Sequence, residues 1–489
     1  MPSERWQRVG LGVLLVSLGC SEAPATQPAA AGQAAGGASG GGAATLAGSG
    51  GSDVSGGAPT GGGGATGGSG GSTQTGGGST STAGGGGMAP AELDPGTMLG
   101  KHLFGYQGWF AAPGDGSPRD RWVHWFSGNT PTAEAATFDL WPDLSELDDD
   151  ELFPTSLTLP GGAPARLFSS YKEKTVVRHF AWMKDAGIDG VFVQRFLLDV
   201  RSMTTKQVRD QVLLNARAGA EQHGRVFSVM YDVSGAPENS LTGDLLAEWA
   251  YLVETLKITE SPRYLRHAGK PVLAVWGLGF SDRPGTAAQA RDIIDQLQTG
   301  PHPVTLVGGV PSNWRTLDED SKTEAAWADV YRSFDVLSPW AVGRYADDAG
   351  ADTFREQRIA PDLAELAGTD IAYMPVVFPG FSWHNLNDEY PLNQIPRRGG
   401  AFYWRQVHNA LQAGSTMLYG AMFDEVDEGT AFFKAAPSSD DLPEQGTFLA
   451  LDADGESLPS DWYLRLGGAA TRALRGEIAA TPELPIPKP

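Results

Sequence analysis

Short apolar runs alternate with longer amphipathic segments from about residue 100 to the end of the chain. The apolar runs predict strands at 102–110, 190–196, 225–232, 271–277, 304–310, 335–341, 371–378 and 415–425. The amphipathic segments predict helices at 173–187, 205–224, 241–257, 285–300, 323–334, 352–368, 401–414 and 462–476. Strands that are apolar on both faces and separated by helices indicate a parallel sheet.

This alternation predicts an α/β fold made of a single (β/α)8 TIM barrel. A doubly wound open sheet is the alternative, but it needs a glycine-rich phosphate turn after its first strand, and "FGYQGWF" (104–110) is not one. Residues 110–170 are a long insertion, rich in Pro, Gly and Asp, that we expect near the barrel mouth. We assign residues 96–478 to the barrel and 479–489 to a Pro-rich tail.

The start of the chain has the pattern of an export signal. Two arginines precede the apolar run 9–19, which is too short to span a bilayer and ends at Cys20. Gly19-Cys20 resembles a bacterial lipobox, although Ser17 stands where an aliphatic residue is usual. We therefore expect residues 1–20 to be a lipoprotein signal peptide and Cys20 to carry lipid. The protein would be exported and anchored at the bacterial outer membrane or cell surface; an ordinary signal peptide and a secreted protein are the alternative.

The segment after the signal is a predicted linker. Residues 24–90 are almost entirely Gly, Ser, Thr and Ala, and we assign the linker to 21–95. Such a composition buries too little apolar area to offset the entropy of ordering, so we expect disorder. A flexible tether of this length reaches roughly 40–50 Å and would hold a folded domain clear of a membrane.

Composition and charge narrow the classes of partner. The 489 residues carry a formal net charge of −22, and such an acidic surface repels nucleic acid. The single cysteine excludes an intramolecular disulfide and a cysteine-based metal site. The eight histidines show no H-E-x-x-H motif and no paired metal spacing, so we expect no metal and no cofactor.

The carboxyl ends of the predicted strands carry aromatic and polar residues, which is where barrels of this class place their chemistry. In chain order these candidate residues are Tyr106, Trp109, Arg195, Tyr231, Asp232, Trp276, Trp314, Trp383, His384 and Asn385, and "WVHW" in the insertion adds His124 and Trp125. Aromatic walls beside hydrogen-bonding groups suit the C–H faces and hydroxyls of sugars. The set predicts a carbohydrate cleft, although each member alone is equally typical of a packing residue.

The stretch "AMFDEVDEGTAFFK" (421–434) crowds carboxylates at the end of the last predicted strand. Glu425 and Glu428 are three residues apart, so a turn between them would direct both into a barrel mouth. Glycoside cleavage needs such a pair, one group to supply a proton and one to act as base or nucleophile. Crowding also separates their pKa values. A solvated acidic loop is the alternative.

Two motifs, "FGYQGWFAAPGDGS…WVHW" and "MFDEVDEGT", resemble the glycoside hydrolase family 71/99-like proteins, which include endo-α-mannosidases and α-1,3-glucanases. The resemblance covers about residues 100–476 and implies a (β/α)8 barrel. It also implies catalytic carboxylates in a Glu-x-x-Glu motif followed by Gly-Thr, which Glu425, Glu428 and Gly429-Thr430 match. One departure is Val426-Asp427, where the endo-mannosidases carry Trp-His.

The resemblance implies a glycoside hydrolase in which Glu428 is the general acid and Glu425 is a base that deprotonates the sugar's own 2-hydroxyl. That route needs a 1,2-trans glycoside, with α-mannosides first, and retains configuration. The alternatives are an inverting α-1,3-glucanase and a catalytically inactive carbohydrate-binding surface lipoprotein. We expect a monomer whose partners are a polysaccharide or glycan and, through the N-terminal lipid, a membrane.

Overall fold

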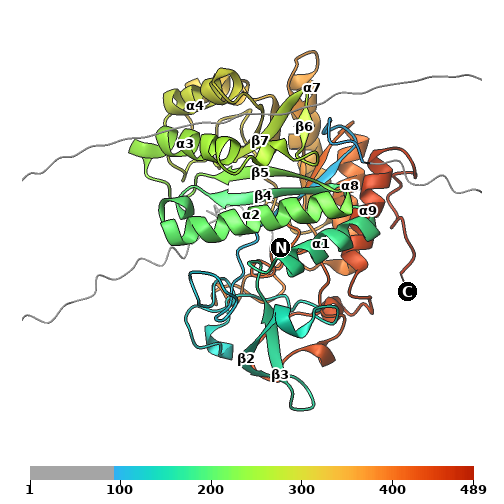
Figure 1. Cartoon of the computed structure of the whole chain (residues 1–489). Coiled ribbons are helices and arrows are strands. Elements are labelled where there is room, and N and C mark those ends of the chain that lie inside the picture. The colour runs from blue at the N-terminus through green and yellow to red at the C-terminus, as the bar shows by residue number, and fades with distance from the viewer. Residues whose placement is uncertain (1–92, 489) are drawn as a thin grey trace, which may run out of the picture. The chain divides into compact units, whose positions relative to one another are not determined.

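The computed structural model describes residues 93–488, so the predicted signal peptide, Cys20 and all but the end of the predicted linker lie outside the described residues. Within the described part, parallel strands form one sheet whose two ends meet in a ring. The strands of this ring are β1 (His102–Tyr106), β4 (Gly190–Phe196), β5 (Val226–Asp232), β7 (Lys270–Trp276), β8 (Thr305–Val310), β9 (Val336–Pro339), β10 (Ala372–Tyr373), β11 (Val376–Val377) and β12 (Leu418–Gly420). The helices are α1 (Glu173–Ala186), α2 (Met203–His223), α3 (Leu241–Glu254), α4 (Ala287–Thr299), α5 (Ala326–Tyr331), α6 (Asp348–Phe354), α7 (Ala360–Leu366), α8 (Ala401–Gln412) and α9 (Trp462–Leu474). Helices lie along the strands on the outside, as α2 does beside β4 and β5 in Figure 1.

The ring closes through one short stretch of chain. β10 pairs in parallel with β9, whereas β11, which follows β10 closely, pairs in parallel with β12. β12 in turn pairs with β1. Since β10 and β11 are the two halves of the predicted strand 371–378, this segment joins the two ends of the sheet. The fold is therefore the predicted (β/α)8 barrel.

The side chains of the strands alternate between the inside of the barrel and the helix layer. On β4, Phe192 packs in the barrel interior, where its ring lies 6.0 Å from that of Tyr419 on β12. Val191 and Val193, on either side of Phe192, belong instead to the core between the strands and the helices. This alternation decides which residues at the strand ends face the mouth and which face the helices.

Several predicted elements have other bounds in the structure; the strand predicted at 102–110, for example, ends at Tyr106. The strand predicted at 415–425 ends at Gly420, because the chain then turns into the acidic loop. The helix predicted at 352–368 consists of α6, a π-helical turn at Arg355–Ile359 and α7. Pro361 has no backbone N–H and closely follows the π-helical turn, so the regular hydrogen-bond ladder is interrupted where the π turn passes into α7.

The insertion after β1 folds into a hairpin of β2 (Leu152–Thr158) and β3 (Pro164–Phe168), which lies apart from the strand ring in Figure 1. Aromatic rings hold the rest of the insertion against the chain beyond the acidic loop: Phe138 lies 5.1 Å from Phe448. The insertion is thereby placed beside the carboxyl end of β12.

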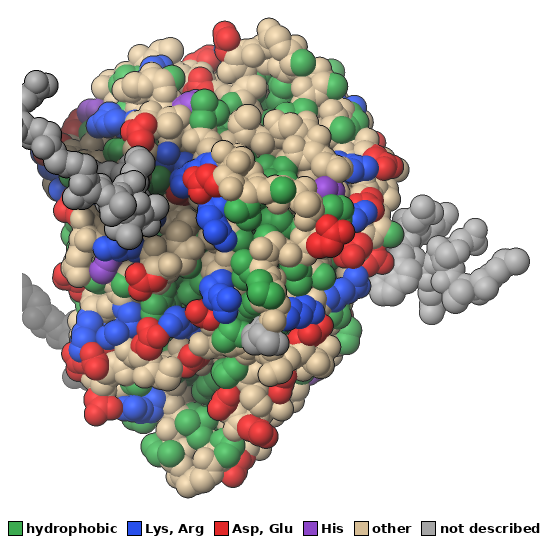
Figure 2. All heavy atoms as spheres, turned by 90° about the vertical axis from the view of Figure 1, so that its right-hand side faces the viewer, with side chains coloured by type: hydrophobic (Ala, Val, Ile, Leu, Met, Phe, Trp, Pro, Cys, Tyr) green, Lys and Arg blue, Asp and Glu red, His purple; other side chains and the backbone are tan. Residues whose placement is uncertain are grey.

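Acidic and basic side chains are interspersed over the face of the molecule in Figure 2, with hydrophobic side chains between them. No helix among residues 93–488 combines the length and the apolar character that crossing a bilayer requires.

Candidate active site

The acidic loop that follows β12 is tightly folded. Thr430 N donates to Glu425 O at 3.0 Å, and Met422 N donates to Thr430 O at 3.3 Å. Gly429 has a φ of 63°, and a Cβ at this position would lie 3.0 Å from the backbone N of Ser382. Arg397 Nη2 fixes the loop by donating to the carbonyl oxygens of Gly429 and Ala431 at 2.7 and 2.8 Å.

The four carboxylates of this loop are buried. Asp424, Glu425, Asp427 and Glu428 are 0, 3, 2 and 8% exposed. A solvated acidic loop, the alternative considered from the sequence, is therefore excluded. Like charges held together without water oppose one another's ionisation, so the loop must share protons at neutral pH.

Asp424 joins the loop to the end of β1. Its two carboxyl oxygens accept from the backbone N–H groups of Gln107 and Gly108 at 2.7 and 2.8 Å. Burial raises the pKa of Asp424 to about 7, although both backbone donors favour its ionised form. Because its oxygens are already occupied by backbone donors, Asp424 holds the two segments together.

Glu425 has a donor on each carboxyl oxygen. Gln107 Nε2 donates to Oε1 at 2.7 Å, and Thr430 Oγ1 donates to Oε2 at 2.6 Å. Burial and then the charge of Asp427 raise the pKa of Glu425 to about 8, while the two donors act in the opposite sense. Within the cluster, Glu425 is thus a carboxyl group whose ionised form the protein supports and orients.

Glu428 lacks that support. Its backbone oxygen accepts from Ser382 N at 2.9 Å, but among the described residues we find no donor to its carboxyl group. Burial, followed by the charges of Glu425 and Asp427, raises the pKa of Glu428 well above its ordinary value. Glu428 therefore holds its proton more firmly than Glu425, whose two donors favour its ionised form, and this is the order that an acid and a base require.

Asp427 contacts the insertion. Its Oδ2 lies 3.0 Å from Nδ1 of His124, whose ring stacks on Trp109 with centroids 3.9 Å apart and planes 4° apart. Trp109 in turn stacks on Phe196 at 5.9 Å. His124 thus lies directly beside the carboxylates, whereas Trp109 is 5% exposed and packs against the ring of His124.

The strand ends carry further predicted residues. Asp232, at the end of β5, accepts from Ser234 N at 2.7 Å and from Gln194 Nε2 at 3.4 Å, and burial raises its pKa. Trp276, at the end of β7, lies 5.0 Å from Trp340 and is half-buried. Carboxylates, amides and indole rings therefore follow one another along the carboxyl ends of β12, β1, β4, β5 and β7.

The segment containing Trp383, His384 and Asn385 closes the other side of the loop. Asp139 of the insertion holds it, accepting from the backbone N of His384 at 2.7 Å and of Asn385 at 2.8 Å. The side-chain amide of Asn385 donates to Phe138 O at 2.8 Å, so its first role is to hold the insertion. His384 Nδ1 lies 2.7 Å from a backbone carbonyl oxygen.

Three predicted sugar contacts face the helices instead. Tyr106 OH lies 2.9 Å from His179 Nδ1 on α1. Arg195 forms ion pairs with Asp210 of α2 and Glu248 of α3, and Tyr231 lies next to Arg195 in the same layer. The reason is the two-residue period of a strand, which sends Gln194 inward and its neighbour outward. Tyr106, Arg195 and Tyr231 are thus removed from the proposed sugar site.

Two predicted tryptophans are also packing residues. Trp125 and Trp314 are fully buried. The indole N–H of Trp125 donates to Phe168 O at 2.9 Å, and that of Trp314 donates to Asp362 Oδ2 at 3.0 Å. Both indoles are surrounded by protein, so neither offers a face to a sugar.

The sequence interpretation did not assign Gln107, Asp424 or Asp139 to the site. Gln107 and Asp424 lie inside the two motifs that carried the resemblance, so their position was the available signal. Asp139 had no such signal, because its partners are more than 240 residues away in the chain. Thr430, noted only for its register with the family motif, proves to be a donor to Glu425.

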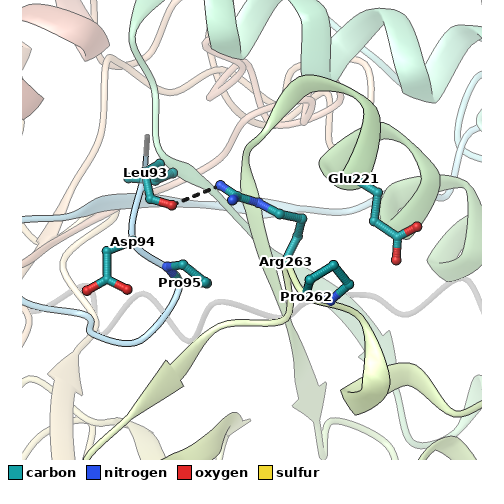
Figure 3. A pocket seen from close by; sticks show the side chains of 6 residues that line it. All are labelled: Leu93, Asp94, Pro95, Glu221, Pro262 and Arg263. Carbon is teal, nitrogen blue, oxygen red and sulfur yellow. Dashed lines mark hydrogen bonds between the residues drawn. The ribbon is translucent and has the colours of Figure 1, made fainter. Parts of the chain in front are cut away.

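Two other features of the described residues were considered as sites. The hollow in Figure 3 lies between Asp94 and Arg263, near the amino end of β5, and contains no pair of carboxylates in hydrogen-bonded contact. Asp148 and Asp150 approach Glu151, but Lys174 contacts both aspartates at 2.7 Å and so offsets their charge. We therefore place the candidate active site at the acidic loop.

The protein thus combines a closed barrel with a pair of buried carboxyl groups after its last strand. No family model matches the chain, and no curated protein matches it. Among solved structures, the GH99 endo-α-mannosidase from Bacteroides thetaiotaomicron is similar over 78% of this chain and 99% of its own, with a TM-score of 0.56 and 14% identity. The structure of that enzyme with bis-tris-propane gives a TM-score of 0.55 and 14% identity, over 79% of this chain and 100% of the other. This similarity shows a shared fold.

Proposed function

We propose that the protein is a glycoside hydrolase that cleaves O-glycosidic bonds of an extracellular polysaccharide or glycan. The observation that carries the proposal is that the carboxyl groups of Glu425 and Glu428 differ in their hydrogen-bond donors. Both are buried on one loop at the barrel mouth, but Glu425 has two donors and Glu428 has none among the described residues. Base and acid roles require this division of protons.

In the proposed mechanism Glu428 gives its proton to the departing glycosidic oxygen. Glu425 accepts the proton of the sugar's 2-hydroxyl, and O2 forms a bond to the anomeric carbon as the bond to the leaving oxygen breaks. Water then attacks the anomeric carbon and gives a proton to the Glu428 carboxylate; the bond between O2 and the anomeric carbon breaks, and Glu425 returns its proton to O2. Because each step approaches from the opposite face, the configuration is retained overall. O2 can attack in this way only when it is trans to the scissile bond.

We favour α-mannosides among the 1,2-trans glycosides. The shared fold with an endo-α-mannosidase and the Glu-x-x-Glu-Gly-Thr motif both support this choice. Val426-Asp427 differs from the Trp-His of the endo-mannosidases, so the sugar next to the cleaved bond has to be found by screening.

The proposal is tested by screening α-mannans and other 1,2-trans glycosides and then measuring kcat/KM for Glu425→Gln and Glu428→Gln. We expect each variant to lose several orders of magnitude, because each removes a proton-transfer group. Glu389→Gln, an exposed glutamate on the nearby 381–390 segment, is the matched control and should keep parental activity. Near-parental activity of both site variants would contradict the assignment.

The stereochemistry separates the proposed mechanism from an inverting α-1,3-glucanase. The anomeric proton of the first-formed product, followed by NMR, should show retention. An inverted product would require a water between acid and base and carboxyl groups roughly 6.5–9.5 Å apart. Binding on a glycan array without any product would instead support a catalytically inactive carbohydrate-binding surface lipoprotein.

We further propose that the protein is a lipoprotein anchored through Cys20, which lies outside the described residues. Cys20→Ala should move the protein from the membrane to the soluble fraction, since stable anchoring needs the attached acyl chains. Cys20→Ser, which keeps the size of the side chain but removes the thiol that would carry lipid, is a second variant. If both variants fractionate with the membrane as the parent does, the lipidation proposal fails.

A further inference from the structure

His124 is held in the site from two directions. Its ring lies flat on Trp109, and its Nδ1 lies 3.0 Å from Asp427 Oδ2. The backbone of His124 has a φ of 60°, so the loop adopts an uncommon conformation to bring the ring there. Because Asp427 occupies Nδ1, Nε2 is the ring nitrogen that an incoming molecule can contact. The side chain of His124 is 29% exposed, whereas that of Asp427 is 3% exposed.

The groups around Asp427 disfavour its ionised form. Glu425 and Glu428 share its loop, and Asp139 faces it from the insertion. Oδ1 of Asp427 is buried and has no hydrogen-bond partner among the described residues. The backbone N–H groups of Asp427 and Glu428 favour the ionised form, but burial is the larger influence and raises the pKa of Asp427 well above its ordinary value. An ionised Asp427 would add a second negative charge beside that of the proposed base, Glu425.

The groups around His124 disfavour its charged form. Arg119 lies near it in the insertion, and Arg209 approaches from α2. Arg209 Nε donates to Asp199 at 2.9 Å, which offsets part of its charge on the ring. Burial and these guanidinium groups lower the pKa of His124. A neutral imidazole has one N–H, on either Nδ1 or Nε2.

We propose that Asp427 is a positioning residue that remains a neutral acid, donates its O–H to His124 Nδ1 and so keeps the N–H of the imidazole on Nε2. The Nε2–H then donates to an acceptor oxygen of the sugar bound beside Glu425. The identity of the ligand as a sugar rests on the proposed function; the proton arrangement of the pair does not.

A change of pH has a defined effect on this pair. When pH rises far enough to remove the proton from Asp427, the carboxylate accepts from Nδ1–H and Nε2 becomes an acceptor. The site then loses a donor to the substrate and gains a negative charge next to Glu425. Both changes weaken the productive complex on the alkaline side.

The arrangement can be read directly from the nitrogen chemical shifts of full-length protein labelled with 15N-histidine, without any substrate. The eight histidines are few enough for His124 to be assigned by its loss in His124→Gln. His384 provides an internal reference with the proton on the other nitrogen, because its Nδ1–H donates to the carbonyl oxygen of Tyr390 at 2.7 Å.

At pH 7 we expect His124 to show a protonated Nε2 and an unprotonated, hydrogen-bonded Nδ1. Asp427→Ala should move the Nδ1 resonance toward that of a free imidazole nitrogen and leave His384 unchanged; Asp427→Asn, which is isosteric, gives a second variant should the alanine variant not fold. In Asp427→Asn any change of His124 with rising pH should vanish, because the amide does not titrate. An imidazolium ring or an Nδ1–H tautomer at pH 7 in the parent would overturn the proposal. Since no substrate is used, that result is separable from a failure to find glycosidase activity.

Discussion

Thr430 and Gln107 each donate one hydrogen bond to the carboxyl group of Glu425 and so favour its ionised form. The bond from the Thr430 hydroxyl is the shorter of the two, at 2.6 Å. Thr430→Val keeps the shape of the side chain but removes this donor. A base must be ionised, so losing a donor to the carboxylate raises its pKa and moves the acidic limb of kcat/KM to higher pH. The expected shift is about one to two pH units, since a hydrogen bond to a charged group contributes about 1.5–3 kcal/mol and one pKa unit corresponds to about 1.4 kcal/mol.

The measurement is the pH dependence of kcat/KM on the glycoside identified by screening. Thr430→Ser is the matched control, because it keeps the hydroxyl and loses only a methyl group. Its acidic limb should stay with that of the parent. Superimposable pH profiles for the valine and serine variants would show that the Thr430 hydroxyl does not act on Glu425, the proposed base.

Residue types at strand ends could be predicted from the sequence, but the direction of each side chain could not. Gln194 and Arg195 are neighbours on β4, and the pattern alone gave no reason to prefer either for the mouth. Arg195 turns outward because Asp210 and Glu248 on α2 and α3 neutralise its charge there, and those contacts exist only in the folded chain. Trp109 and Trp125 differ in the same way, since one stacks on His124 beside the carboxylates and the other lies inside the insertion.

At the scale of elements, the regular alternation of apolar and amphipathic segments was sufficient to predict the barrel. Each ring strand and each helix was expected close to where the structure has it, because two-sided burial and amphipathic periodicity are properties of local sequence. The hairpin of β2 and β3 was missed. Its strand "LFPTSLT" contains Pro154 and three hydroxyl residues, which weaken the signal of a strand.

The contact between α9 and α1 gives a prediction at this scale. A Cβ at Gly468 of α9 would lie 1.7 Å from the carbonyl oxygen of Ala186, the last residue of α1. Gly468→Ala must therefore push the two helices apart, and we expect it to lower the free energy of unfolding by about 1–3 kcal/mol. Chemical or thermal denaturation followed by circular dichroism measures the change.

Gly243 of α3 is the matched control, because it is also a helical glycine but no heavy atom lies within 4 Å of the position that a Cβ would take. Gly243→Ala should be neutral or stabilise by up to about 1 kcal/mol, the difference in helix propensity between the two residues. Equal effects of the two substitutions would contradict a close approach of α9 to α1.

At the scale of the whole molecule, the site joins segments that lie far apart in the chain. The end of β1 meets the acidic loop through Gln107 and Asp424, and the insertion meets it through His124 and Asp427. More than 300 residues separate the partners in each contact. The sequence placed each segment at a strand end, but only the closure of the barrel brings them together.

This assembly has a consequence for stability, because it buries carboxyl groups whose pKa values are raised in the folded state. Burial raises the pKa of Asp424 to about 7 and, with the charge of Asp427, that of Glu425 to about 8, against roughly 4 in an unfolded chain. Between these limits the two carboxyl groups bind more protons in the folded protein than in the unfolded chain, so their contribution lowers the free energy of unfolding as pH rises from about 4 toward 8. Buried His102, His124 and His179, whose pKa values burial lowers to about 3, act in the opposite sense below about pH 6.5.

Glu428→Gln should relieve part of this cost, since an amide stays neutral and removes one charge from the neighbourhood of Glu425 and Asp427. We expect the variant to be more stable than the parent near pH 8 by about 1–3 kcal/mol, because folding the parent at that pH requires Glu428 to take up a proton or to bury a charge, and one pKa unit corresponds to about 1.4 kcal/mol. Near pH 5 the difference should shrink, because the unfolded glutamate then also begins to bind a proton. Glu389→Gln changes the net charge by the same amount at an exposed position, so it controls for the general repulsion of a chain with a net charge of −22. The measurement is thermal unfolding of the three proteins at both pH values. If the gain in stability of Glu428→Gln is the same at pH 5 and pH 8, Glu428 does not carry a raised pKa in the folded protein. The same conclusion follows if Glu389→Gln gains as much stability as Glu428→Gln.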